Sequence, residues 1–132
     1  YKYIDLIFSE GNNIPRISAN KNEIRQVILN LLKNSIEAMP DGGDIIIKTL
    51  KKRIHKKTYA ELHIIDEGEG LIEADIQNVF MPFYSKKDGK ENNMGLGLSI
   101  CYSIVEKYRG ILAAHNNRTK GCTFVVSLPA EV

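Results

Sequence analysis

The segment that most constrains this chain is 93–100, Asn-Met-Gly-Leu-Gly-Leu-Ser-Ile, in which two glycines come directly before an amphipathic helix. Glycine allows backbone amides to approach a ligand closely, because it has no side chain to block them. The first turn of the helix adds unpaired N–H groups and the positive end of the helix dipole. The pattern therefore predicts an anion site, with polyphosphate as the natural ligand. A plain tight turn before a helix has the same pattern.

The composition is that of an ordinary globular chain. It has 132 residues, of which 43% are hydrophobic and 26% are charged, and we expect residues 1–132 to form a single domain with a hydrophobic core. The formal net charge of +2 is too small to favour nucleic acid or an anionic membrane as a partner. Cys101 and Cys122 lack metal-binding or redox spacing, so we expect two reduced core thiols.

Apolar residues at helical spacing predict two long helices. Asn20 and Glu23 have the spacing of a capping box, and the helix that they begin continues to about Met39. A second helix is expected over 96–109, with Gly110 as its C-cap. A short helix is expected over 73–80.

Apolar and β-branched runs predict five strands, which are residues 3–8, 44–50, 58–66, 111–115 and 122–128. The basic segment 51–57 reads as the connection of an antiparallel hairpin, and the lysine-rich segment 84–94 as a mobile loop. This order predicts an α+β fold, a two-layer α/β sandwich in which helices cover one face of a mixed, mostly antiparallel sheet.

Three polar residues share one face of the first long helix. Asn30, Asn34 and Glu37 are spaced at i, i+4 and i+7. Asparagine is a poor helix former in the middle of a helix, so the pair needs a reason beyond a solvated helix edge. Mg²⁺ is held by a few protein oxygens together with substrate phosphates. Asn34 and Asn30 are therefore candidate metal ligands, and all three residues are catalytic candidates.

Asp66 follows an apolar strand and precedes Gly68 and Gly70. A carboxylate at this point can accept a hydrogen bond from the exocyclic amine of adenine, and small glycines allow a flat base to come close. An ordinary Asp-Gly turn is the alternative. Lys86, in the loop 84–94, is placed to reach a phosphate when a lid closes, although a solvated surface lysine explains it equally well.

In this order the segments resemble the ATP-binding catalytic domain of bacterial sensor histidine kinases, within the gyrase, Hsp90, histidine kinase and MutL ATPase superfamily. The resemblance covers nearly the whole chain and implies the Bergerat fold with an ATP lid. Five segments are similar to the family's boxes: the N box at 26–38, the first glycine box at 66–70, the F box at 80–87, the second glycine box at 95–99 and the last at 121–124. The F box is most like that of nitrogen-regulation and sporulation sensor kinases.

The resemblance implies a role for each matching residue. Asn34 would hold Mg²⁺, with Asn30 assisting near the phosphates, and Asp66 would bind the adenine amine, directly and through a water shared with Thr123. The glycines would admit the base or contact phosphates beneath the lid. The residues expected to bind ATP are Asp66, Gly68, Gly70, Lys86, Gly95, Leu96, Gly97, Leu98 and Thr123.

The resemblance implies an ATP-dependent protein-histidine kinase of two-component signalling. The enzyme would bind Mg·ATP and transfer the γ-phosphate to a histidine on a separate dimerisation domain, with a response regulator downstream. His55, His63 and His115 lack the sequence context of a phosphoacceptor, so we interpret them as structural and expect this chain to be the catalytic part of a longer kinase.

We expect a cytoplasmic domain with no direct membrane contact, and the sequence leaves open whether the parent protein is anchored in a membrane. The alternatives are a serine kinase of the anti-sigma type, a conformational ATPase on the same fold, and a degenerate nucleotide-binding docking module.

Overall fold

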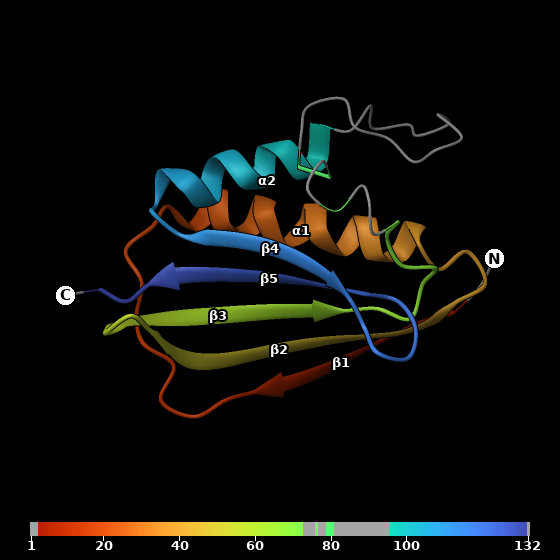
Figure 1. Ribbon diagram of the computed structural model, residues 1–132, viewed down its shortest axis with the longest axis horizontal. Coiled ribbons are helices and arrows are strands. Elements are labelled where there is room, and N and C mark those ends of the chain that lie inside the picture. Colours follow the sequence, from red (N-terminus) through yellow and green to blue (C-terminus); the bar gives the residue numbers. More distant parts are fainter. Residues whose placement is uncertain (1–2, 73–75, 77–78, 81–95, 132) are drawn as a thin grey trace.

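The strands form one five-stranded sheet with the helices on one face (Figure 1). The computed structural model describes residues 3–72, 76, 79–80 and 96–131. Strand β1 pairs in parallel with β2, and the other pairs are antiparallel, in the order β1-β2-β3-β5-β4. This arrangement confirms the predicted α+β sandwich with a mixed, mostly antiparallel sheet. The elements are β1 (Ile4–Glu10), α1 (Lys21–Glu37), β2 (Gly43–Ile54), β3 (Lys57–Ile65), α2 (Leu96–Lys107), β4 (Ile111–Asn116) and β5 (Cys122–Pro129).

The hydrophobic core lies between the sheet and the helices α1 and α2. Side chains alternate across a strand, so alternate apolar residues of β2 and β5 point toward the helices. They meet Val27 and Leu31 of α1, which are almost completely buried. Cys101 and Cys122 are both buried, reduced thiols, as expected of core thiols. The other core members include Ile45, Ile47, Ile64, Val105, Leu112, Phe124, Val126 and Leu128.

Helix α1 begins as predicted at the N-cap Asn20, but the capping box is only half formed. The side chain of Asn20 accepts a hydrogen bond from the Glu23 N–H at 3.1 Å. The Glu23 carboxylate turns instead to the end of α2, where it accepts from the Tyr108 hydroxyl and from Lys107 Nζ at 3.0 Å. Those two hydrogen bonds hold the pKa of Glu23 below its usual value. A cation and a phenol are stronger partners for this carboxylate than a backbone amide.

The prediction that Gly110 is the C-cap of α2 is wrong by one residue. The left-handed residue is Arg109, with φ 60°, and the Gly110 N–H donates to the Val105 carbonyl at 2.9 Å, as in a Schellman motif. Glycine is needed at 110 for packing, because a Cβ there would lie 2.5 Å from the Ser127 carbonyl oxygen.

The predicted hairpin connection at 51–57 is also wrong. Strand β2 continues through Ile54, and the turn consists of His55 and Lys56 alone, with φ 49° and 68°. Two left-handed residues are what a tight type I′ hairpin turn requires. The polar side chains of residues 51–53 are exposed to solvent, while the backbone of these residues pairs with β3. The polar composition of residues 51–53 therefore indicated a loop, although their backbone is hydrogen-bonded to β3 in the sheet.

Two predicted segments fall outside this description. The loop 84–94 lies wholly outside the described residues, and most of the helix expected over 73–80 does too. Among the helices that the structure describes, none has the length and apolar character that crossing a membrane requires.

Candidate nucleotide site

The polar face of α1 lies beside the beginning of α2. Asn30 and Asn34 are half-buried and Glu37 is exposed. The Asn30 amide donates to the Gly97 carbonyl at 3.3 Å, so the N box is joined directly to the second glycine box. Burial raises the pKa of the Cys101 thiol to about 12, and a hydrogen bond with Asn30 opposes that rise only in part. The Asn34 side chain makes no hydrogen bond within the described part of the chain.

Asp66 is a buried carboxylate at the end of β3, with only 2% of its surface exposed. Its Oδ1 accepts two backbone hydrogen bonds, from the Gly68 N–H at 2.8 Å and the Cys122 N–H at 3.1 Å. No other hydrogen bond to this carboxylate occurs among the described residues. One oxygen therefore fixes the side chain, and the other remains an acceptor.

The glycines around Asp66 are required by close backbone contacts. A Cβ on Gly68 would lie 2.6 Å from the Ala38 carbonyl oxygen, at the end of the N box. A Cβ on Gly121 would lie 2.1 Å from the Asp66 carbonyl oxygen, and Gly70 has φ +82°. These contacts hold the first glycine box against the N box and the last box. A role in admitting a base remains a prediction.

Two asparagines that the sequence analysis did not select hold this loop in place. Asn116 forms a pair of hydrogen bonds with the backbone of Leu71, at 2.7 and 2.8 Å. Asn117 donates to the Asp66 carbonyl at 2.9 Å and accepts from the Thr123 hydroxyl. An Asn-Asn pair directly after a strand was the available signal, because asparagine side chains often replace backbone partners in turns.

The second glycine box begins α2. No described atom lies within 4 Å of the position that a Cβ of Gly97 would occupy, so this glycine, unlike those around Asp66, borders open space. Leu98 packs partly against the core, and Leu96 is the first residue of the helix. Lys86 and Gly95 lie outside the described residues.

Phe80 of the F box packs between α2 and the last glycine box. Its ring centroid lies 5.8 Å from that of Tyr102 in a stacked arrangement and 6.3 Å from that of Phe124 in an edge arrangement. Phe80 is therefore a partly buried residue packed against the core.

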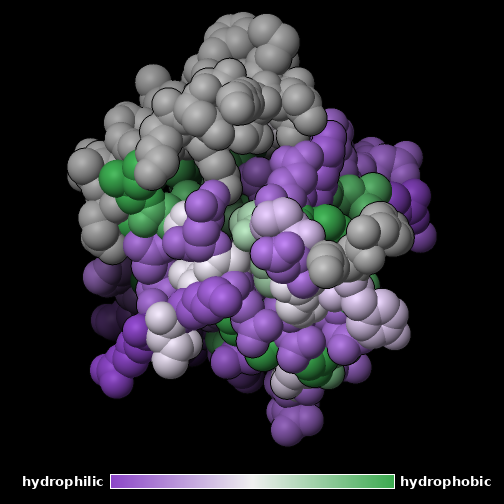
Figure 2. All heavy atoms as spheres, turned by 90° about the vertical axis from the view of Figure 1, so that its right-hand side faces the viewer, coloured by the Kyte–Doolittle hydropathy of each residue, from purple (hydrophilic) through white to green (hydrophobic). Residues whose placement is uncertain are grey.

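The C-terminal end of α1, the end of β3 and the beginning of β5 lie at the right of Figure 1, the end that Figure 2 shows face-on. Hydrophilic residues predominate there, with less polar residues between them (Figure 2). The described residues contain no group of three or more His, Cys, Asp or Glu side chains that could hold a metal ion.

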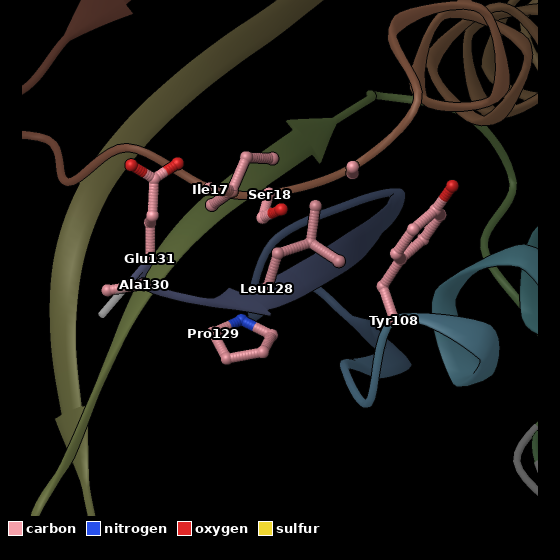
Figure 3. Close-up of a pocket in the computed structure, with 8 residues that line it drawn as sticks. Ile17, Ser18, Tyr108, Leu128, Pro129, Ala130 and Glu131 are labelled. Atoms are coloured by element: carbon pink, nitrogen blue, oxygen red, sulfur yellow. The ribbon is translucent and has the colours of Figure 1, made fainter.

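A hollow of about 320 Å³ lies at the opposite end, between the C-terminal end of α2 and the end of β5 (Figure 3). It contains none of the candidate site residues. The Tyr108 hydroxyl on its wall already bonds Asn20 and Glu23. The lining residues are Ile17, Ser18, Ala19, Tyr108, Leu128, Pro129, Ala130 and Glu131. The sequence boxes and this hollow are therefore separate features.

The three histidines lie where the sequence placed them. His55 is in the β2–β3 turn, His63 is in β3 and His115 is in β4. His63 Nε2 lies 3.0 Å from Glu61 Oε1. None of the three lies in a helix.

Comparisons with known proteins give relatives that match most of this chain. Sporulation kinase E of Bacillus subtilis (strain 168) is 36% identical over 128 residues, which are 97% of this chain and 16% of that protein. Sporulation kinase C of the same organism is 39% identical over 115 residues, which are 87% of this chain and 25% of that protein. The chain therefore spans a quarter or less of the length of these curated relatives.

A solved structure of the catalytic domain of histidine kinase ThkA superposes with a TM-score of 0.75 at 31% identity, covering 96% of this chain and 80% of that one. The family described as histidine kinase-, DNA gyrase B-, and HSP90-like ATPase matches residues 19–132. The chain belongs to this ATPase family.

Proposed function

We propose that this chain is the catalytic domain of a sensor histidine kinase, which binds Mg·ATP and transfers the γ-phosphate to a histidine of a separate dimerisation domain. The observation that carries the proposal is the geometry of Asp66, a buried carboxylate with one oxygen held by two backbone amides and the other without a partner among the described residues. Its position beside the N box and the last glycine box is supported by the contacts at Gly68 and Gly121.

Adenine recognition follows from this geometry. The backbone amides of Gly68 and Cys122 fix the carboxylate, so Asp66 Oδ2 is held ready to accept from the exocyclic amine of adenine. Preorganised acceptors bind well because little ordering is left for the ligand to impose. Thr123, which donates to Asn117, keeps its oxygen lone pairs available for a bridging water.

The metal role of Asn34 and Asn30 agrees with the chemistry of the site. Since the described residues include no acidic cluster, the cation would be held mainly by phosphate oxygens, with amide oxygens from α1. This is the usual manner of Mg²⁺ in phosphoryl-transfer sites. When bound, Mg²⁺ would neutralise charge on the phosphates. Glu37, which lies on the same helix face, is the candidate for orienting groups near the metal.

The first turn of α2 is suited to the phosphates. Its backbone N–H groups carry the positive end of the helix dipole, and Gly97 borders open space where other residues would place a side chain. The hydrogen bond from Asn30 to the Gly97 carbonyl sets this turn relative to α1. Leu96 and Leu98 would contribute backbone contacts, and Gly95 and Lys86 would complete the phosphate contacts from the lid.

The acceptor must come from elsewhere, because His55, His63 and His115 lie in a turn and in strands. A helical dimerisation domain of the same parent protein, with a response regulator downstream, is the partner that this catalytic domain requires. Phosphoryl transfer depends on in-line positioning, which contributes roughly 7–11 kcal/mol to such reactions. The isolated chain should therefore bind ATP and label itself negligibly.

The test combines this chain with γ-labelled ATP, with and without a histidine-bearing dimerisation domain from the same parent. Acid-labile labelling of the added domain, and none of this chain alone, is the expected result. Acid-stable label would indicate a serine kinase of the anti-sigma type. Release of phosphate without transfer would indicate a conformational ATPase. Absence of nucleotide binding would indicate a docking module.

A further inference from the structure

Cys101 lies at the contact between α2 and α1, two helices that run side by side on the sheet (Figure 1). Its side chain is completely buried. Burial raises the pKa of the thiol to about 12, so the sulfur keeps its proton at neutral pH. A protonated thiol can donate one weak hydrogen bond and accept another. Cys101 does both, and both of its partners belong to α1.

The direction of the Cys101 thiol is fixed by its first partner. Its Sγ lies 3.6 Å from the Val27 carbonyl oxygen. A carbonyl oxygen can only accept, so the thiol hydrogen points at Val27. The lone pairs of the sulfur are then left for Asn30, the second partner. Because the thiol has no other hydrogen to donate, the Asn30 amide nitrogen must be the donor in this second contact.

Asn30 has two amide hydrogens and two acceptors on α2. One acceptor is the Gly97 carbonyl, at 3.3 Å, and the other is the sulfur of Cys101. Gly97 and Cys101 are one helical turn apart, so they face α1 together. A carbonyl oxygen and a sulfur lone pair both require the nitrogen of the amide on their side. The Asn30 nitrogen is therefore turned toward α2, and its Oδ1 is left for other partners.

We propose that Cys101 is a positioning residue of the nucleotide site, which orients Asn30 so that its amide oxygen, and not its amide nitrogen, faces the phosphates and their cation. The inference rests on the proposed function, in which Asn30 assists near the phosphates. Mg²⁺ takes oxygen ligands, and an inverted amide would present two donors in their place. A side chain that is already oriented needs little further ordering when a ligand arrives. Because Cys101 is completely buried, it acts through Asn30 without touching the ligand.

The first test is NMR of the ¹⁵N-labelled chain and needs no ligand. The Asn30 side-chain amide should give two signals that exchange slowly with water, one for each acceptor. Cys101→Val cannot accept a hydrogen bond, so one signal should lose its protection. Cys101→Ser, whose hydroxyl donates and accepts as the thiol does, should keep both. Val105→Ala is the matched control, because Val105 is also buried on α2 and its side chain has no polar group. It should leave both signals unchanged.

The second test is calorimetry of ATP with and without Mg²⁺. The ratio of the two affinities measures how much the cation contributes to binding. Cys101→Val should reduce this ratio about fivefold, the effect of one lost hydrogen bond, and should keep metal-free binding within about twofold of the wild type. Cys101→Ser should restore the ratio, and Val105→Ala should keep it. In an Asn30→Ala background, Cys101→Val should have no further effect, because Cys101 acts only through Asn30.

The outcomes separate this inference from the function on which it rests. A wild type that binds no ATP, or binds it equally well with and without Mg²⁺, refutes the metal role in the proposed function and this inference with it. If Mg²⁺ does tighten binding, three results overturn the inference alone: unchanged Asn30 signals in Cys101→Val, equal effects of Cys101→Val and Val105→Ala, or additive losses in the double variant. Circular dichroism checks that each variant is folded, and Cys101→Ala replaces Cys101→Val in both tests if the larger side chain disturbs the fold.

Discussion

The two carboxylate oxygens of Asp66 have different roles: Oδ1 accepts backbone hydrogen bonds and Oδ2 is the proposed acceptor for adenine. The substitution Asp66→Asn tests the second role while keeping the first. The N–H groups of Gly68 and Cys122 both point at Oδ1, so they should hold the amide oxygen of the new asparagine at that position. The amide nitrogen then occupies the position of Oδ2. The fold keeps both of its hydrogen bonds, while the nucleotide meets a donor where it had an acceptor.

The expected loss of adenine affinity follows from hydrogen-bond energies. The hydrogen bond with the adenine amine is worth about 0.5–1.5 kcal/mol, and leaving two buried donors facing each other costs about 1–3 kcal/mol more. The sum, about 2–4 kcal/mol, weakens ADP binding by roughly 30-fold to 1,000-fold. Asp66→Ala is less informative, because it also leaves the buried N–H groups of Gly68 and Cys122 without an acceptor. Each unsatisfied N–H costs about 1–3 kcal/mol of folding free energy. Loss of binding in that variant would be mixed with loss of stability.

Titration calorimetry of ADP and GDP with the wild type and Asp66→Asn provides the assay. Guanine presents a carbonyl where adenine has its amine, so the wild type should bind ADP at least about tenfold more tightly than GDP. In Asp66→Asn this preference should disappear, since the new amide can donate to the guanine carbonyl. Thermal melting should show a folded variant. If folded Asp66→Asn keeps ADP affinity within about threefold of the wild type, the assignment of Asp66 to adenine is refuted.

Three further outcomes follow. Asn34→Ala should abolish the Mg²⁺ dependence of ATP binding while the fold survives, and calorimetry with and without Mg²⁺ checks this; unchanged metal dependence would exclude Asn34 as a ligand. Ser35→Ala should raise stability by about 1 kcal/mol in denaturant unfolding, because the buried Ser35 hydroxyl has no hydrogen-bond partner among the described residues; a lower midpoint would contradict this. Burial alone would raise the pKa of Glu61. Hydrogen bonds from His63 and Ser127 lower it by more than burial raises it, so the pKa of Glu61 in the folded chain is below its usual value. The stability that the ionised Glu61 carboxylate contributes to the folded chain is fully present above its pKa in the unfolded chain, about 4.3. It is lost as the pH falls through its lower pKa in the folded chain. Ser127→Ala should therefore cost stability at pH 7 and progressively less in denaturant titrations below about pH 4; a cost that grows toward acid pH would reverse the argument.

The sequence predicted what depends on periodicity and on strongly patterned boxes. Helix α1 begins at its expected N-cap, because asparagine before an apolar run with helical spacing has a local physical cause. The predicted strand 44–50 is shorter than β2, because the polar residues 51–53 are held in strand conformation by pairing with β3. The turn at His55 and Lys56 has no glycine to mark it. Tertiary pairing, which no local pattern reports, decided both features.

The nucleotide site shows the same division between local and long-range causes. Glycines at 68 and 70 indicated close approach, and close approach is present, but Gly68 lies against Ala38 and Gly70 lies close to Asn116. Asn117 binds the Asp66 carbonyl from 51 positions away in the sequence, so its role depends on β4 and β5 bringing it back to the loop. A box motif thus identifies which residues gather at the site. The contacts that rigidify Asp66, and so prepare its free oxygen for adenine, come from strands that are distant in the sequence.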